Sequence, residues 1–247
     1  MSGLKRAAAY SIKPNMLERC GPKDAYKVLF DYVTNRTDFA ESAIREILRQ
    51  FEVATPYYTL IARANGINDP FDERVVEAYW LGNELLEKVT AEAVGWVIEQ
   101  DVKREGWNSE QISLMFRAIT LEKARAHHSL SVMYFFTRPG RELDPLVTKS
   151  IQDSLDNCRV CSGIVIECGE QLTVIYQPLL FDYQRIVRIG EPEKKTINWG
   201  MFYPNDSVVD TGSVIAFHHG WAIECLSVEQ ARNLDKYTRL TLAAVNP

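Results

Sequence analysis

The chain has 247 residues, which is enough for one large domain or two small ones. Hydrophobic residues make up 46% and charged residues 25% of the chain, so a packed core is expected and global disorder is excluded. The formal net charge is -5 and no long basic run occurs, so the sequence predicts neither a nucleic-acid partner nor a basic membrane-binding patch.

No stretch of about eighteen apolar residues occurs, so we expect no membrane-spanning helix. The apolar part of the N-terminal segment is too short for a signal peptide. A cytoplasmic protein is therefore expected, in which the five cysteines are reduced thiols. The odd number of cysteines also disfavours a complete set of disulfides.

The first part of the chain, residues 1–156, predicts a helical domain, because apolar residues recur there at helical spacing. Asp38 is expected to cap a helix, and Pro56 to begin another that ends at Asn65 and Gly66. Further helices are predicted at 24–33, 73–89, 91–103 and 109–124 and from Pro145, whereas 128–136 fits either a helix or a strand.

The second part, residues 157–247, is β-rich and predicts short strands separated by Gly, Pro and Asp. Ser227 is expected to cap a last helix, with Gln230 in the capping-box position. The predicted strands are 163–167, 172–177, 184–189, 195–199 and 213–218, with a turn at 203–206. The expected fold is thus α+β: a helical N-terminal domain followed by a small OB-like β-barrel with a C-terminal helix.

Two segments of the second part carry a family resemblance. Residues 212–223 read Gly-Ser-Val-Ile-Ala-Phe-His-His-Gly-Trp-Ala-Ile, and Cys158 stands five residues before Gly163, where a predicted strand begins. Both segments resemble HypC/HupF-type chaperones, which help to build the iron centre of NiFe hydrogenases. His218 falls on the functional histidine of that family, and Trp221 replaces its usual Phe.

The resemblance implies that Cys158 and His218 hold iron in transit, as an Fe(CN)2CO fragment. It also implies a partner, either the hydrogenase large subunit or a HypD-type scaffold protein. Thiolate and imidazole donors suit such a metal, and we expect the two side chains within about 8 Å of each other. Unlike the family's cysteine, which stands at the mature N-terminus, Cys158 follows a predicted helix and is held at both ends.

Cys161 and His219 are weaker ligand candidates. Cys161 completes a Cys-x-x-Cys pair with Cys158, but no second such pair follows to complete a zinc site. His219 adjoins His218, and neighbouring residues of a strand face opposite sides, so both imidazoles are not expected in one site.

The whole chain also resembles an uncharacterised bacterial family often encoded beside NiFe-hydrogenase genes. Its matching segments include Arg74 to Trp80, His127 to Ser129 and Leu155 to Cys158. This resemblance implies the hydrogenase context and no particular reaction.

A second site is conceivable in the helical domain. Glu52, Glu77, His127 and His128 have the composition of a carboxylate-bridged metal site, although no Glu-x-x-His occurs. The alternative is that both glutamates pair with arginines, with Arg45, Arg63 and Arg74 as the candidates. Three functions therefore stay open: a maturation accessory protein, a metal-dependent enzyme that makes or modifies a ligand of the iron, and a non-catalytic docking protein.

Overall fold

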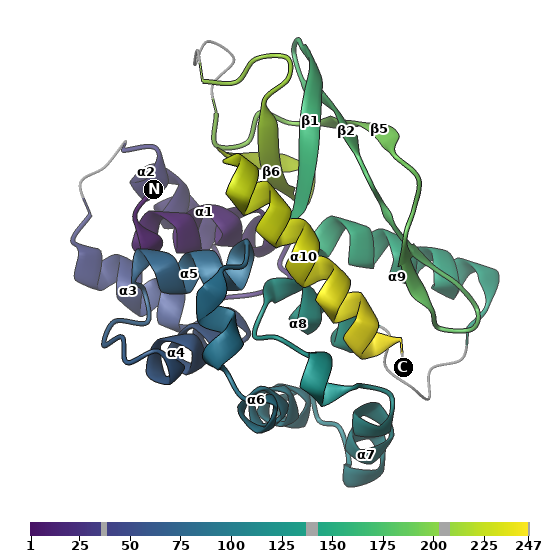
Figure 1. The fold of residues 1–247 in the computed structure, drawn as a ribbon. Helices are drawn as coiled ribbons and strands as arrows, with labels where there is room; N and C mark the ends of the chain where they lie inside the picture. The colour runs from purple at the N-terminus through teal and green to yellow at the C-terminus, as the bar shows by residue number, and fades with distance from the viewer. Residues whose placement is uncertain (36–38, 137–142, 203–207, 247) are drawn as a thin grey trace.

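The structure is a computed structural model that describes residues 1–35, 39–136, 143–202 and 208–246. The expectations for Asp38 and for the turn at 203–206 lie outside these residues. Figure 1 shows helices gathered on one side of a β-sheet, with the C-terminal helix running between the two. The α+β class is thereby confirmed.

The N-terminal part consists of helices. Its α-helices are α1 (Gly3–Met16), α2 (Ala25–Val33), α3 (Glu41–Arg49), α4 (Ala54–Ala64), α5 (Glu73–Trp80), α6 (Ala91–Arg104), α7 (Ser109–Arg117) and α8 (His128–Phe136). Two short 3-10 helices, η1 (Glu84–Lys88) and η2 (Leu121–Lys123), follow α5 and α7. The single helices expected at 73–89 and 109–124 are therefore each broken in two, and the ambiguous segment 128–136 is helical.

Helix α1 was not expected from the sequence pattern. Pro14 lies inside it and normally disfavours a helix, because proline lacks the N–H donor. Here it stands in the last turn, where only one hydrogen bond is lost. Ala7, Ala8 and Ala9 are fully buried, so α1 runs through the interior and presents no simple amphipathic stripe.

The β-rich part begins after α9 (Pro145–Cys158). Five antiparallel strands pair in the order β5-β2-β1-β6-β7, with β1 (Cys161–Cys168), β2 (Leu172–Tyr176), β5 (Glu193–Ile197), β6 (Val214–His218) and β7 (Trp221–Cys225). A separate hairpin joins β3 (Leu179–Phe181) and β4 (Val187–Ile189). All five predicted strands are present, with shifted ends, whereas β3 and β7 were not predicted.

The five-stranded sheet does not close into a barrel among the described residues. The chain just after β5 reaches the other edge strand, β7: Asn198 forms an isolated parallel bridge with Trp221, and the Met201 N–H donates to the Ala222 carbonyl at 2.9 Å. A small core that includes Val165, Val174 and Phe217 fills the concave side of the sheet. The expected OB-like barrel is thus not confirmed: the sheet curls until the chain after β5 contacts β7, but no continuous strand pairing closes it among the described residues.

The last helix, α10 (Val228–Val245), begins as predicted. Ser227 accepts from the backbone of Gln230, and the Gln230 side chain accepts from the backbone N–H of Ser227, which completes the capping box. The larger hydrophobic core extends from α1 to α10 and includes Leu179, Ala216 and Tyr237 beside the residues of the helical part. A division at residue 156 stays a prediction, and the two parts share this core. Among the described residues, no helix is both long and apolar enough to cross a membrane.

Gly82 provides a test of how tightly α10 is docked. Its φ is +86°, and a Cβ placed on it would lie 2.1 Å from a ring carbon of Tyr237 on α10. We expect Gly82→Ala to lower the free energy of unfolding by about 3 kcal/mol, from left-handed strain plus overpacking. The measurement is urea unfolding of the purified chain.

Gly66→Ala is the matched control, because Gly66 also has a positive φ (+68°) but nothing lies within 4 Å of its added Cβ. Only the strain of about 1–2 kcal/mol should appear there. Equal losses for the two variants would mean that Tyr237 yields freely and that α10 is loosely packed.

Candidate metal centre

Three side chains from three different elements converge at the junction of the helices and the sheet. His128 begins α8, Cys158 ends α9 and His218 ends β6. Their ligand atoms all lie within 4.8 Å of one another. Within the described parts of the chain, this is the one such group of three or more His, Cys, Asp or Glu side chains. The expected proximity of Cys158 and His218 is thus met, and His128 joins them.

The pairing of β1 with β6 explains why Cys158 and His218 meet. These strands are antiparallel, with Cys161 opposite Phe217, so the chain just before β1 lies beside the end of β6. The backbone N–H of His219 donates to the carbonyl of Asn157 at 2.9 Å, which extends the contact past the strand ends. Since α9 leads almost directly into β1, Cys158 is held at this point.

The backbone carbonyl of Cys158 is the focus of both imidazoles. It belongs to the last turn of α9, where carbonyls lack a donor within the helix and carry the negative end of the helix dipole. Nε2 of His128 lies 2.9 Å and Nε2 of His218 lies 2.7 Å from this oxygen. Nδ1 of His128 lies 3.1 Å from the Tyr79 hydroxyl, so this ring can accept there and donate to the carbonyl.

His218 faces a carbonyl oxygen on each side of its ring. Its Nδ1 lies 3.0 Å from the backbone oxygen of Tyr10 in α1. In a regular helix that oxygen would accept from residue 14, but Pro14 has no N–H. The imidazole therefore takes the place of the missing helical donor, and this favours the tautomer with the proton on Nδ1.

That tautomer leaves the lone pair of Nε2 opposite the Cys158 oxygen at 2.7 Å. Whichever nitrogen carries the proton, a neutral ring leaves one contact between two acceptors. Only a cation relieves it, either a second proton on the ring or a metal ion. Burial lowers the pKa of His218 to about 4, so protonation is unfavourable near neutral pH.

The donor set fits a metal ion. A tetrahedral ion with bonds of about 2.0–2.3 Å needs donors about 3.3–3.7 Å apart, so these three need to approach by no more than about 1.5 Å. Hydrogen bonding of Nδ1 to a backbone carbonyl is also the usual way in which a histidine ligand is oriented. Two imidazoles and one thiolate would leave one position of a four-coordinate ion open.

An aromatic wall surrounds the cluster. The Trp80 ring lies 4.4 Å from that of His128 and 5.7 Å from that of His218, and it stacks on Tyr10 at 4.8 Å between centroids. Burial raises the pKa of the Cys158 thiol to about 12, with a smaller contribution from Cys20. The thiol is thus protonated at neutral pH until something replaces the proton.

Cys161 and His219 lie outside the cluster. Cys161 is buried in the core of the curled sheet, with its Sγ 3.6 Å from the backbone oxygen of Asp156. His219 was expected to continue the strand of His218, but it lies in the two-residue turn before β7. There His219 and Gly220 have φ of +49° and +71°. Its ring lies 4.6 Å from that of His218, and burial lowers its pKa to about 2.

The second expected site is not assembled as a metal centre. Glu52 is exposed and pairs with Arg104 at 3.2 Å. Glu77 pairs with Arg6 at 3.2 Å and accepts from Gln230 at 2.7 Å. Both glutamates therefore pair with arginines, as the alternative predicted, but the partners are Arg104 and Arg6, which were not among the expected arginines.

The two histidines of that expected site also contact different partners. Nδ1 of His127 lies 2.6 Å from the Ser129 hydroxyl, while His128 belongs with Cys158 and His218.

A buried ion pair behind the cluster was not anticipated. Arg6 of α1 donates two hydrogen bonds to Glu224 of β7, at 2.9 and 3.0 Å, and the Tyr10 hydroxyl donates to the same carboxylate. This pair ties α1 to the sheet and so holds the Tyr10 carbonyl against His218. An isolated Arg and an isolated Glu separated by 218 positions give no signal of this pairing in one sequence.

Fold and site together define an α+β protein with a cluster of two buried histidines and one half-buried cysteine at the meeting point of its helices and its sheet. Residues 1–247 match a family of unknown function (DUF6390), and the chain belongs to that family. No curated protein and no solved structure matches the chain.

Proposed function

We propose that this protein binds one transition-metal ion through His128, Cys158 and His218. The observation that supports it most is the pair of imidazoles directed at one helix-terminal carbonyl beside a thiol, with all ligand atoms within 4.8 Å. The uncompensated contact at His218 Nε2 gives a cation a place to bind. The aromatic wall excludes water and strengthens the electrostatic interactions inside.

We further propose that the metal is iron destined for a NiFe hydrogenase. This part depends on the resemblance of Cys158 and His218 to the site of HypC-type chaperones. The cargo would be the Fe(CN)2CO fragment, and the partner the hydrogenase large subunit or a HypD-type scaffold in the cytoplasm. A curled antiparallel sheet followed by a helix is compatible with the OB-like fold of that family.

The charges around the cluster are compatible with an anionic cargo. The electrostatic influence of Arg19, Lys13 and Lys195 reaches His219 and lowers its pKa, after the larger effects of burial and of His218. Arg19 acts in the same direction on the pKa of the Cys158 thiol. Cationic side chains on this side of the site favour a bound fragment that carries negative ligands such as cyanide.

The deciding experiment is purification under anaerobic conditions from a host that makes a NiFe hydrogenase. We expect iron in the protein, and infrared bands of bound CN and CO that are absent from Cys158→Ser. Iron without these bands would support the metal site and remove the Fe(CN)2CO cargo. A protein that holds no metal and takes up none in vitro would leave docking as the function.

Metal affinity should depend steeply on pH. The pKa of Cys158 is raised to about 12 and that of His218 is lowered to about 4, so between these values the free site has a protonated thiol and neutral imidazoles. Binding then releases one proton, and the affinity should rise about tenfold per pH unit between about pH 6 and 9. Competition titration of Co²⁺ across this range measures the slope.

His219→Asn is the control for this slope, because His219 is outside the cluster. Its slope should equal that of the unaltered protein. A pH-independent affinity would exclude the thiolate as a ligand, and a hundredfold change per unit would indicate that a second thiol also loses its proton.

A further inference from the structure

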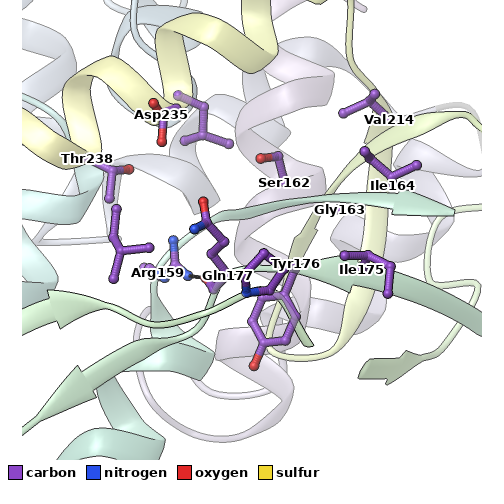
Figure 2. A pocket seen from close by; sticks show the side chains of 13 residues that line it. Arg159, Ser162, Gly163, Ile164, Ile175, Tyr176, Gln177, Val214, Asp235 and Thr238 are labelled. Atoms are coloured by element: carbon purple, nitrogen blue, oxygen red, sulfur yellow. Dashed lines mark hydrogen bonds between the residues drawn. The ribbon is translucent and has the colours of Figure 1, made fainter. Parts of the chain in front are cut away.

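A groove separate from the metal centre lies between α10 and the outer face of the sheet. Figure 2 shows Asp235 and Thr238 of α10 on one side and residues of β1 and β2 on the other. The cavity has a volume of about 260 Å³, which suits a small molecule and not a large cofactor. It exists because α10 covers only part of this face, so that Ile164 of β1 stays 50% exposed.

The two ends of the groove differ in chemistry. In Figure 2, Arg159, Gln177 and Thr238 gather at one end, whereas Ile164 and Ile175 lie at the other. Val214 extends the apolar end, and the Ser162 side chain lies between the two. A ligand that matches this arrangement has one polar head and a short apolar body.

Arg159 gives the polar end its charge. Its side chain is only 8% exposed, and its Nε is buried without a hydrogen-bond partner. Its Nη2 donates to the backbone oxygen of Gln177 and lies 3.5 Å from the Asp156 carboxylate. A buried guanidinium with an unused donor favours an additional anion.

The Asp156 carboxylate beside Arg159 is shared among several donors. Its oxygens accept from the backbone N–H of Leu179 at 2.9 Å, the Tyr176 hydroxyl at 2.8 Å and Lys195 at 3.0 Å. This carboxylate thus serves two cations, Arg159 and Lys195, and Glu193 lies 3.1 Å from the same Tyr176 hydroxyl. None of these contacts uses the Nε of Arg159.

The rim of the groove adds no free negative charge. Asp235 is held by both oxygens to Arg239, at 3.0 and 2.8 Å.

We propose that this groove binds a small aliphatic carboxylate, with its carboxylate at Arg159 and its hydrocarbon part along Ile164, Ile175 and Val214. Bidentate pairing of guanidinium with carboxylate supplies the orientation. The apolar end selects a body of a few carbons, because the cavity is short and open at the Ile164 side. This site is independent of the proposed metal and of any hydrogenase partner.

The test is a titration of the full-length protein with 4-methylpentanoate, followed by backbone amide NMR. Saturable shifts at Ser162, Gly163 and Ile175 are expected in the millimolar range. 4-Methylpentan-1-ol lacks the charge and inorganic phosphate lacks the hydrocarbon part, and each should bind at least about tenfold more weakly. If the alcohol binds equally well, the groove is only an apolar patch. If phosphate binds equally well, the groove offers only a cation. Either result overturns the proposal.

Two variants and one matched control complete the test. Arg159→Gln should weaken 4-methylpentanoate about tenfold or more, through loss of the charged hydrogen bonds. Ile164→Asp adds a negative charge at an exposed position of the open end, so it should weaken binding without disturbing the core. Its match is Leu146→Asp, an 83% exposed leucine on α9, about 20 Å from Arg159 along the helix, which should bind like the unaltered protein. Binding unaffected by Ile164→Asp would overturn the proposal even if Arg159→Gln fails to fold.

Discussion

We expect Cys158→Ser to lower the affinity for Co²⁺ or Fe²⁺ by about a hundred- to a thousandfold while leaving the fold intact. Four-ligand structural zinc sites bind with roughly 10–16 kcal/mol, so one ligand contributes about 3–4 kcal/mol. A serine hydroxyl keeps the shape of the side chain but is a poor donor for these metals. The readout is the thiolate-to-cobalt charge-transfer absorption, which should disappear, together with the thermal unfolding temperature of the apoprotein, which should hardly change.

Two other cysteines serve as controls for this result. Cys168 is exposed, and Cys168→Ser should retain both the affinity and the charge-transfer band. Cys161→Ser tests the second member of the Cys-x-x-Cys pair, whose thiol lies in the core of the curled sheet. If Cys161→Ser loses the metal and Cys158→Ser retains it, Cys161 is the ligand and the assignment to Cys158 is wrong.

Acid should unfold the apoprotein unusually steeply. Burial lowers the pKa of His127 to about 3, of His218 to about 4 and of His219 to about 2, and that of His128 well below its ordinary value. Below pH 6.5 the four imidazoles therefore become protonated in the unfolded chain while they stay neutral in the folded chain. Stability is present above that pH and is lost as the pH falls toward about 4.

The magnitude follows from the number of protons. Burial raises the pKa of Asp101 to about 6. On acidification this carboxyl takes up its proton in the folded chain before it does so in the unfolded chain, so it offsets one of the histidine protons. A net excess of about three protons removes about 4 kcal/mol per pH unit. For a stability of about 6–10 kcal/mol at neutral pH, which is usual for a small protein, we expect unfolding with a midpoint between about pH 4 and 5. Circular dichroism of the chelator-treated protein against pH measures this transition.

His219→Asn isolates one of these protons. Asparagine tolerates the left-handed backbone of this turn (φ +49°), so stability at pH 7.5 should change little. The pH dependence should become shallower by one proton, about 1.4 kcal/mol per pH unit, and the midpoint should move to lower pH. A variant with an unchanged slope, or an unaltered protein still folded at about pH 3, would show that these imidazoles are not buried in their neutral form.

Much of the fold could be predicted from contacts between residues that are close in the sequence. Ser227 and Gln230 identify the start of α10, because a capping box is a contact between residues three apart. Four of the five strands of the sheet, and β4 of the hairpin, follow from short β-rich runs between turn residues, whereas β7 was not predicted. The closeness of Cys158 and His218 was also accessible, since a family resemblance placed them at one site and the β1–β6 pairing brings them to the same end of the sheet.

The identity of the third donor came only from the tertiary structure. His128 begins α8 and Cys158 ends α9, 30 positions later, and the spacing of His128 to either partner matches no motif. The tautomer of His218 depends on Pro14, 204 positions earlier in the chain, because that proline frees the Tyr10 carbonyl. The same holds for Arg6 and Glu224, for the arginine partners of Glu52 and Glu77, and for the open edges of the curled sheet. Periodicity and caps report on neighbours along a helix or strand, whereas these contacts join segments whose proximity is decided by how the whole core packs.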